Sequence, residues 1–312
     1  MTQTQKLVVL GSINADHVLA VPHFVQPGET LAGNGYHIAY GGKGANQAVA
    51  AARLGTPTDF IACIGDDTLG AAMKNAFAQD GINTESIVTV ADEMSGIAMI
   101  QVAASGENSI VLAAGANAHL DQTLVAQFAD KIAHADTLLM QLETPLEGVL
   151  AAAKIANANQ TQVVLNPAPA QPLSDELLAL ADMITPNETE TEILTGIKVD
   201  DEASAKQAAE VFHQKGIATV LITLGAKGVF VSQKGGFNGI IAGFRVQAVD
   251  TTAAGDTFNA GLLTALLEGK ALNEAVRFAH AAAAISVTRH GAQPSIPTRQ
   301  ETEQFLQAQL SN

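Results

Sequence analysis

The sequence predicts an α/β protein: a doubly wound, mostly parallel sheet flanked by helices, with a small antiparallel lid sheet beside it. Three observations support this fold class. Short apolar runs alternate with helical patterns through the first two thirds of the chain. Hydrophobic residues make up 47% of the chain and charged residues only 15%, so the strands are expected to be covered on both faces. Two half-apolar segments interrupt the alternation.

Six apolar runs predict buried strands, and helical patterns separate most of them. The expected strands cover residues 6–11, 58–65, 136–142, 161–166, 181–185 and 219–225. The expected helices cover residues 45–54, 67–80, 121–133, 146–158, 188–195 and 203–215. This alternation is typical of βαβ units, which build a parallel sheet with helices on both faces.

The last third of the chain changes character. The runs "GVFVS" (228–232) and "GIIAGFRVQAV" (239–249) predict strands joined by the turn-rich "QKGGFNG". Two alanine-rich helices are expected at 256–268 and 273–288, and an amphipathic helix at 299–310.

The two interrupting segments, 18–40 and 96–112, predict the lid. Their short apolar–polar alternation indicates antiparallel strands with one exposed face, and the second segment forms a hairpin around "SGEN". Ordinary surface hairpins are the alternative. The expected organisation is one α/β domain made of residues 1–17, 41–95 and 113–312, which binds nucleotide and sugar, and a lid made of 18–40 and 96–112.

Composition and charge exclude several classes of partner. The chain has 312 residues and a net charge of −15, which argues against nucleic acid and anionic membranes as partners. A phosphorylated substrate remains compatible, because backbone amides, a few cations and Mg²⁺ hold phosphates locally. A single cysteine, Cys63, rules out a disulfide framework. The polar start of the chain has no signal-peptide core, and no run is long enough to span a membrane, so a cytoplasmic protein is expected.

Polar side chains follow the predicted strands. In an open α/β sheet, ligands bind beyond the carboxyl ends of the strands, so these side chains are candidates for one site. Asn187 with Glu190 three residues later also fits a helix N-cap with its reciprocal glutamate. The clusters are Asn14 with Asp16, Glu143, Asn166, Asn187 with Glu190, and the loop "GAKG" at 225–228.

The stretch "YGGKGANQAVAAARLG" (40–55) places three glycines around Lys43 where a helix begins. It is not a phosphate-binding Walker A loop, since His37 stands in place of the first glycine and Gly44 in place of the Ser/Thr. No GxGxxG follows the first strand, which disfavours a dinucleotide-binding domain. Two interpretations stay open: a turn that needs glycine geometry, or a loop whose amides, Lys43 and Asn46 hold a polyhydroxylated ligand.

The stretch "DTTAAGDTFNAG" (250–261) also has two interpretations. Asp256 precedes an apolar helical pattern, which suits a helix cap. Alternatively, the small residues Ala253, Ala254 and Gly255 expose helix-start amides to an anion, with Asp256 as a base beside them. Elsewhere, the eight histidines are scattered, with His280 alone kept as a candidate, and no clustered metal motif or GxSxG elbow is present.

Taken together, these motifs resemble the ribokinase-like family of sugar kinases. The similar stretches, in the family's order along nearly the whole chain, are "GSINAD", "GGKGANQAVAAARLG", "LLMQLETPLE", "LNPAPA", "ITPNETE", "LITLGAKG", "DTTAAGDTFNAGL" and "FAHAAAAISVTRHGAQPSIP". The resemblance implies that ATP phosphorylates the 5-hydroxyl of D-ribose, with Asp256 as catalytic base. It also implies Mg²⁺ with the nucleotide, activation by K⁺, and a homodimer formed through the lid sheets.

The resemblance also implies the role of each site residue. The sugar-binding positions are Asn14, Asp16, Gly42, Lys43, Gly44, Asn46, Glu143 and Asp256, and the anion hole is Ala253, Ala254, Gly255 and Asp256. The nucleotide positions are Asn187, Glu190, Thr223, Leu224, Gly225, Ala226, Lys227, Gly228, Gly255 and His280, with Glu190 tied to placing Mg²⁺ and phosphates. The monovalent-cation positions are Asp250, Thr252, Ser286, Arg289, Gly291 and Ser295.

One position departs from the family pattern, and two other functions stay open. The family's usual Gly-Ala-Gly-Asp reads Ala253-Ala254-Gly255-Asp256 here, so the loop loses the freedom of one glycine. The alternatives are a kinase of the same family that acts on another sugar or a nucleoside, and a sugar-binding regulator without catalysis. The intact Asp256 and anion-hole run disfavour the regulator.

Overall fold

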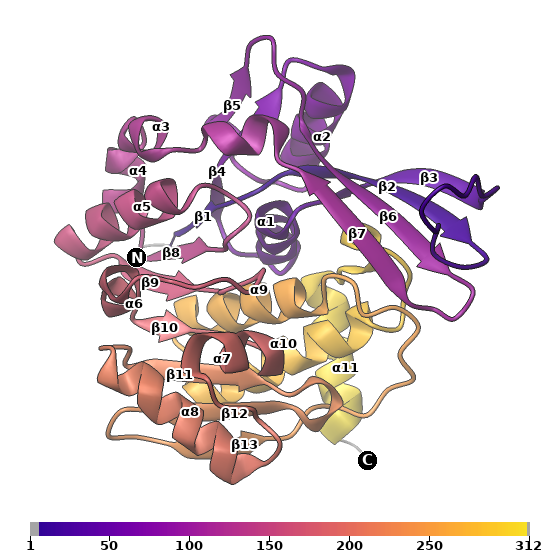
Figure 1. Ribbon diagram of the computed structural model, residues 1–312. Coiled ribbons are helices and arrows are strands. Elements are labelled where there is room, and N and C mark those ends of the chain that lie inside the picture. The colour runs from indigo at the N-terminus through magenta and orange to yellow at the C-terminus, as the bar shows by residue number, and fades with distance from the viewer. Residues whose placement is uncertain (1–5, 311–312) are drawn as a thin grey trace.

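The protein is described by a computed structural model over residues 6–310, in which the strands form two separate sheets (Figure 1). Residues 1–5 and 311–312 of the predicted α/β domain, including the polar start of the chain, lie outside the described residues. We call the two sheets the main sheet and the small sheet.

The main sheet confirms the predicted mostly parallel arrangement. Within residues 6–310 its strand order is β13-β12-β11-β10-β9-β8-β1-β4-β5. The pairs from β5 to β11 are parallel, whereas β12 and β13 pair antiparallel at one edge. The strands are β1 (Leu7–Leu10), β4 (Thr58–Gly65), β5 (Ile87–Val90), β8 (Thr137–Met140), β9 (Gln162–Leu165), β10 (Met183–Ile184), β11 (Thr219–Thr223), β12 (Val229–Gln233) and β13 (Asn238–Ile241).

Helices cover both faces of the main sheet, as Figure 1 shows. One layer contains α1 (Lys43–Arg53), α2 (Thr68–Gln79), α9 (Ala254–Leu267), α10 (Leu272–Ser286) and α11 (Arg299–Leu310). The other contains α3 (Gln122–Ala126), α4 (Ala129–Ala133), α5 (Leu146–Ala158), α6 (Asp175–Leu180), α7 (Glu188–Thr195) and α8 (Glu202–Gln214). Three 3₁₀ turns within residues 6–310 are η1 (Gly115–His119), η2 (Gly225–Lys227) and η3 (Gln293–Ser295).

Strand β1 shows why the sequence requires two helical layers. Successive side chains of a strand point to opposite faces of the sheet. Val9 packs into the core under α1, α9 and α10, whereas Val8 and Leu10 pack into the core under α5 and α8. All three side chains are buried, so an apolar run without alternation marks a strand that is covered on both faces.

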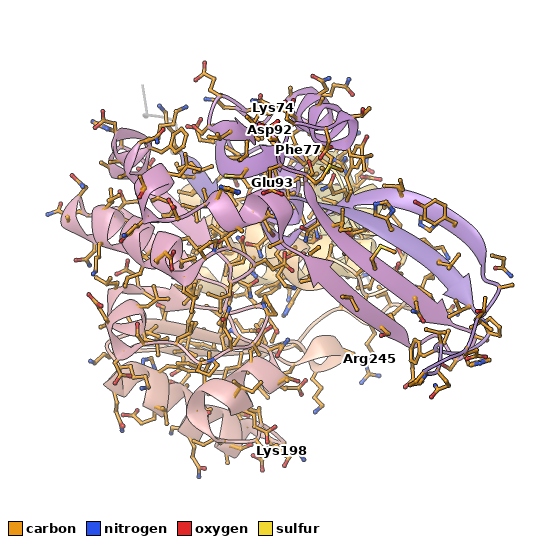
Figure 2. The ribbon with its side chains drawn as sticks, turned by 45° about the horizontal axis from the view of Figure 1, so that its top comes forward. Lys74, Phe77, Asp92, Glu93, Lys198 and Arg245 are labelled. Atoms are coloured by element: carbon orange, nitrogen blue, oxygen red, sulfur yellow. The ribbon has the colours of Figure 1, made fainter. Side chains whose placement is uncertain are left out.

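The small sheet is built from the two interrupting segments and projects from the main domain (Figure 2). Its strand order is β3 (Asn34–Gly41), β2 (Asn14–Val21), β6 (Gly96–Ala103) and β7 (Asn108–Ala113). The β2–β3 and β6–β7 pairs are antiparallel hairpins as predicted, and the hairpins join through parallel pairing of β2 with β6. Strand β2 begins at Asn14, before the predicted segment, so it runs directly out of the site described below.

Three local predictions were wrong. The run at 239–249 ends its strand pairing at Ile241, and beyond it Phe244 packs edge-on against Phe305 of α11, 5.2 Å between ring centres. The single helix predicted at 121–133 is interrupted at Phe128 and forms α3 and α4. Short β5 and α6 were not predicted, since four and six residues are too few for a periodic pattern to stand out from its surroundings. No helix among residues 6–310 is long and apolar enough to cross a lipid bilayer.

Candidate active site

A cavity of about 200 Å³ lies at the carboxyl ends of the parallel strands, where the sheet topology predicts a ligand site. Side chains that follow several different strands meet there with the start of α9. The lining residues are Lys43, Asn166, Ala168, Thr185, Asn187, Glu190, Thr223, Thr251, Ala253, Ala254, Gly255, Asp256 and Asn259. The cavity is therefore lined by the predicted base and by all four residues of the predicted anion hole.

Asp256 is not a helix cap. The N-cap of α9 is Ala253, and Asp256 lies in the first turn with its side chain buried. Its Oδ2 accepts a hydrogen bond from Asn46 Nδ2 at 3.0 Å, and its Oδ1 accepts one from Gln47 Nε2 at 2.9 Å. Both donors lie on α1, within the glycine-rich stretch. They orient the carboxylate, which faces the cavity.

Charge around Asp256 is balanced by Lys43. Burial raises the pKa of Asp256, and the nearby Lys43 ammonium with the two amide hydrogen bonds opposes that rise. Burial also lowers the pKa of Lys43, but the charges of Asp256, Glu143 and Glu190 outweigh it, so the net shift is upward. Lys43 is therefore a cation at neutral pH, placed beside one buried carboxyl group that can take a proton.

The start of α9 presents backbone amides to the cavity. Ala253 adopts a left-handed conformation with φ 59°, a region that costs most non-glycine residues about 1 kcal/mol. The amide of Ala254 donates to the Thr251 carbonyl at 3.2 Å. The amides of Gly255 and Asp256 belong to the first turn, where no acceptor exists within the helix. A Cβ on Gly255 would meet nothing within 4 Å, so this side is open to a ligand.

The glycine-rich loop needs its glycines for close approach to the end of β1. Gly42 has φ 89°, and a Cβ there would lie 2.8 Å from the Asn14 nitrogen and the Ser12 oxygen. A Cβ on Gly44 would lie 2.5 Å from the carbonyl carbon of Gly11. The predicted turn geometry and the predicted ligand loop are therefore compatible, because the same contact brings Lys43 to the cavity.

The predicted sugar-binding residues converge at the base of the small sheet. Glu143 Oε2 accepts from Ser12 Oγ at 2.5 Å and from the Lys43 amide at 3.0 Å. Asn14 Oδ1 accepts from Asn117 Nδ2 at 2.9 Å, which fixes its orientation. Asn46 has a buried Oδ1 without a partner among the described residues.

Asp16 has a strongly altered pKa. Burial, with Glu143 and then Asp256 as neighbouring negative charges, raises the pKa of Asp16 to about 7. No nearby cation or hydrogen-bond donor in the described residues is among the groups that shift it. The carboxylate oxygens of Asp16 can therefore accept hydrogen bonds from hydroxyl groups of a ligand.

Four of the predicted nucleotide residues, Asn187, Glu190, Thr223 and Gly255, line the cavity. Asn187 caps α7: its Oδ1 accepts from the Glu190 amide, and Glu190 Oε2 accepts from the Asn187 amide, each at 2.8 Å. The capping interpretation is therefore confirmed, and both side chains also line the cavity. Burial is the largest cause of a raised Glu190 pKa. Residues 224–228 follow Thr223 in the sequence and contain the η2 turn. Lys227 Nζ lies 3.9 Å from Glu188 Oε1.

His280 lies apart from the cavity lining, in α10. Its ring is buried and stacks obliquely against Phe258 at 5.3 Å between ring centres. Burial lowers the pKa of His280 to about 4, against an opposing contribution from the Ala242 backbone. The ring is therefore neutral at pH 7, and its Nδ1 has no partner in the described residues.

Hydrogen bonds among the predicted cation-binding residues connect the loop at Asp250 with the loop after α10. Asp250 accepts from the Thr252 amide at 2.9 Å, from Thr252 Oγ1 at 2.6 Å and from the Gly291 amide at 2.8 Å. Burial opposes ionisation of Asp250, but these hydrogen bonds outweigh it and lower its pKa. Ser286 Oγ and Ser295 Oγ lie 3.1 Å apart. The Arg289 side chain instead pairs with Glu301 at 2.6 Å, so only its backbone carbonyl is available to a cation.

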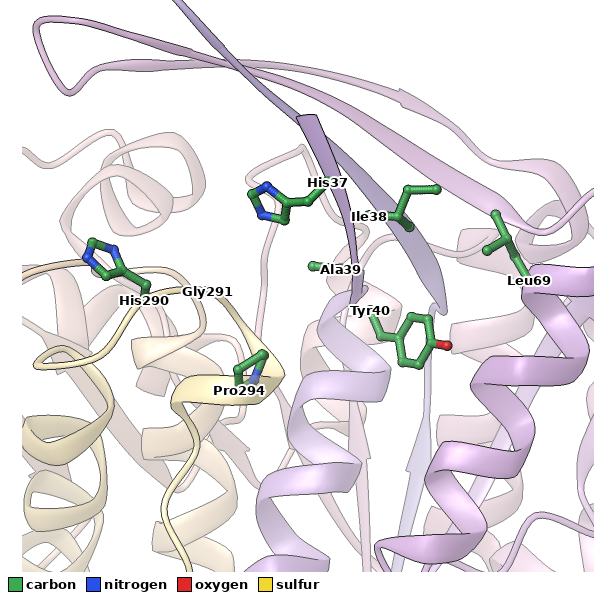
Figure 3. Close-up of a pocket in the computed structure, with 8 residues that line it drawn as sticks. All are labelled: His37, Ile38, Ala39, Tyr40, Leu69, His290, Gly291 and Pro294. Carbon is green, nitrogen blue, oxygen red and sulfur yellow. The ribbon is translucent and has the colours of Figure 1, made fainter. Parts of the chain in front are cut away.

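No cluster of three or more His, Cys, Asp or Glu able to hold a metal ion occurs within residues 6–310. A second, larger cavity of about 490 Å³ lies outside the site, between β3 and the loop after α10 (Figure 3). Figure 3 shows His37 and Tyr40 on β3, and His290 with Pro294 on that loop. It contains no carboxylate or lysine, so the smaller cavity at the strand ends is the candidate active site.

Several site residues were missed by sequence reasoning. Asn117, Gln47, Gln141, Thr185 and Asn259 were not singled out, although each is buried at or behind the cavity. A signal existed for the two glutamines. Gln47 lies among alanines on a buried helix, and Gln141 ends an apolar strand run, and a buried amide in such a place needs a specific partner.

Comparison with known proteins gives consistent matches over nearly the whole chain. A family model described as pfkB family carbohydrate kinase matches residues 4–299. A ribokinase of Haemophilus influenzae is 69% identical over 301 residues, which cover 96% of this chain and 98% of that protein. A ribokinase of Staphylococcus aureus is 44% identical over 303 residues, covering 96% and 99%. The structure of Arabidopsis thaliana ribokinase complexed with ribose and ATP matches with a TM-score of 0.92 at 33% identity, covering 97% of this chain and 99% of that one.

Proposed function

Because the chain belongs to the pfkB family of carbohydrate kinases, we propose that it phosphorylates D-ribose at the 5-hydroxyl with ATP, giving D-ribose 5-phosphate and ADP. The observation that carries the proposal is the arrangement at the start of α9. A buried carboxylate, Asp256, lies beside the cationic Lys43 and the open amides of the first helical turn. The high-identity relatives and the ribose complex of a structural neighbour support ribose as the sugar.

The sugar binds at the base of the small sheet in this proposal. Asp16, Glu143 and Asn46 Oδ1 accept hydrogen bonds from sugar hydroxyls, and Asn14 and Lys43 donate to sugar oxygens. Asn46 Oδ1 and the Asp16 carboxyl group have no hydrogen-bond partner among residues 6–310, so a polyhydroxylated ligand satisfies them without breaking existing bonds. These contacts place the 5-hydroxyl against Asp256.

Phosphoryl transfer then requires little covalent chemistry from the protein. The 5-oxygen attacks the γ-phosphorus, the bond from that phosphorus to the β–γ bridging oxygen breaks, and Asp256 takes the hydroxyl proton. The amides of Gly255 and Asp256 and the Lys43 ammonium lie where they can stabilise charge on the transferred group. Asn187, Thr223 and the turn at 225–228 hold the nucleotide on the opposite side, with His280 beyond them.

Mg²⁺ fits this site as a companion of ATP. The cavity offers Glu190 and two oxygens that have no partner in the described part of the chain, Thr185 Oγ1 and Asn259 Oδ1. Mg²⁺ prefers oxygen ligands and shares its shell with phosphates and water. Bound there, the ion would neutralise phosphate charge. Glu190 is the residue that we expect to position it.

A monovalent cation such as K⁺ fits the neighbouring loops. The ionised Asp250 carboxylate, the Ser286 and Ser295 hydroxyls and backbone carbonyls near Arg289 and Gly291 are hard oxygen donors. A cation there would supply charge that fixes the loop from residue 250 to the start of α9. We therefore propose activation by K⁺ through loop geometry, without contact with the substrate.

We further propose that the small sheet is a lid and the contact surface of a homodimer. Residues in register share a face of a sheet. Asp16 shares a face with Ala98 and Leu112, and this inner face would close over the sugar and exclude water. The outer face carries exposed apolar side chains: Tyr36 (59% exposed), Ile38 (40%), Met99 (51%) and Val111 (67%). A second copy of the chain would cover this outer face.

A substrate panel tests the sugar assignment. D-ribose, 2-deoxy-D-ribose, D-fructose and adenosine are compared by kcat/KM at fixed ATP. We expect D-ribose to have the highest value, because Asp16 and Glu143 together supply acceptors for several hydroxyls. A higher kcat/KM for fructose or adenosine would replace ribose while leaving the kinase assignment in place. The cytoplasm, where ATP is available, is the location that fits this reaction.

A further inference from the structure

The candidate base, Asp256, is hydrogen-bonded to a chain of buried amide side chains. Gln47 Nε2 donates to Asp256 Oδ1 at 2.9 Å and to Asn166 Oδ1 at 3.0 Å. Gln47 Oε1 accepts from Gln141 Nε2 at 2.5 Å. Asn166 Nδ2 in turn donates to the Thr185 carbonyl at 3.2 Å. The chain thus links α1, the ends of β8, β9 and β10, and the start of α9.

Gln47 cannot itself touch a ligand. Its exposed fraction is 0%, and it is absent from the cavity lining, whereas Asn166 and Asp256 line the cavity. Its orientation is fixed, since turning the amide would place its NH₂ against the Gln141 donor and its oxygen against the Asp256 carboxylate. Each polar atom of the Gln47 side chain therefore has a defined partner within the described residues.

We propose that Gln47 is a positioning residue, which fixes Asp256 Oδ1 and leaves Oδ2 as the oxygen that takes the substrate proton. This inference rests on the proposed function. Oδ2 is bound by Asn46, whose side chain is also predicted to contact the sugar and whose Oδ1 is free to accept from it. Oδ2 shares its lone pairs between Asn46 and the substrate hydroxyl, whereas Gln47 holds the carboxylate in its rotamer through the other oxygen, Oδ1.

The hydrogen bond from Gln47 also affects the protonation of Asp256. Burial raises the pKa of Asp256, and the bonds from Asn46 and Gln47 with the charge of Lys43 lower it. The other charged groups that face it are Glu143, Glu190 and Asp16, and all three carboxyl groups favour its neutral form. Removing the Gln47 donor therefore shifts the balance toward the protonated acid, which cannot accept a proton.

The test is Gln47→Met, which keeps the volume and removes both polar atoms. Hydrogen bonds to charged groups are strong enough that we expect kcat for ribose phosphorylation to fall roughly 10- to 100-fold. KM for ribose should stay within about twofold, because the sugar contacts are intact. The acid limb of the kcat–pH profile should move to higher pH. Gln162→Met, at the opposite end of β9, is the matched control and should keep the wild-type profile.

Gln141→Met keeps the inference testable if Gln47→Met does not fold. It removes the group that orients Gln47 without touching Asp256, so it should move the acid limb in the same direction by a smaller amount. An unshifted limb in the folded variants, or a rise in KM with unchanged kcat, overturns the positioning role. Absence of ribose-dependent turnover in the wild-type protein would instead overturn the proposed function, so the two failures are distinguishable.

Discussion

Replacing Asp256 with asparagine separates a catalytic base from a structural aspartate. The carboxylate now accepts from two amide donors, Asn46 Nδ2 and Gln47 Nε2. An asparagine in its place offers one oxygen and one NH₂, so one donor faces another donor. Asn46 can resolve this by turning its amide, because its Oδ1 is buried without a partner in the described residues. The fold should therefore tolerate the change.

The magnitudes follow from the same contacts. The Asp256→Asn variant loses a buried charge and gains a hydrogen bond from the new amide to Asn46, so its free energy of unfolding should stay within about 1 kcal/mol of wild type. Loss of a general base typically lowers the rate about 10²–10⁴-fold. The loose transition state of phosphoryl transfer places the expected loss of kcat near the lower end, at about 10²-fold.

The assay measures initial rates of ADP release at saturating ribose and ATP, ribose affinity by calorimetry, and the thermal midpoint. Asp182→Asn is the matched control, since Asp182 accepts from the Val163 amide at the amino ends of β9 and β10, away from the cavity, and should keep wild-type kcat. A kcat within threefold of wild type in Asp256→Asn would refute the reasoning. A large fall in thermal midpoint with proportional loss of activity would also refute it, because it would indicate a structural role.

Three further predictions concern the sugar, the cation and the lid. Burial raises the pKa of Asp16 to about 7, and we propose that its carboxylate form accepts the sugar hydroxyls. Lowering the pH from 8 to 6 should therefore raise KM for ribose about tenfold, and Asp16→Asn should abolish that dependence. Replacing Na⁺ with K⁺ at equal ionic strength should raise both kcat and the thermal midpoint, and equal values in wild type and Asp250→Ala in both salts would exclude the cation site. Val111→Asp, on the outer face of the small sheet, should halve the mass in solution, and an unchanged mass would contradict the dimer surface. Leu112→Asp, on the inner face, should instead raise KM for ribose.

The sequence predicted the parts of the fold that follow from local periodicity. The parallel strands and the two helical layers were predictable because buried runs such as that of β1 are short, apolar and separated by helical patterns. Parallel pairing of β2 with β6 was not predictable, since nothing local to either hairpin specifies which strand of the other it meets. The loss of strand pairing after Ile241 depends on Phe244 packing against α11, a contact far away in the sequence.

The candidate site also contains some residues that could be predicted from the sequence and others that could not. Residues in distinctive motifs, such as Lys43, Asp16 and Asp256, were predicted from the sequence and its family resemblance and do lie together. The interpretation of Asp256 as a cap was wrong, because the helix begins earlier, at a left-handed Ala253 that sequence patterns do not indicate. Gln47 acquires its importance only from the three-dimensional meeting of α1 with α9.

The most direct test of the account is ribose-dependent formation of ADP by the purified wild-type protein, with the product identified by phosphorus NMR. With D-ribose, ATP, Mg²⁺ and K⁺ present, we expect one ADP for each ribose consumed and a phosphate coupled to the two protons of carbon 5. Without ribose, ADP release should be near the background, because phosphoryl transfer needs an acceptor hydroxyl held in position against the nucleotide. Equal ADP release with and without ribose, or phosphate attached to another carbon, would contradict the proposed reaction.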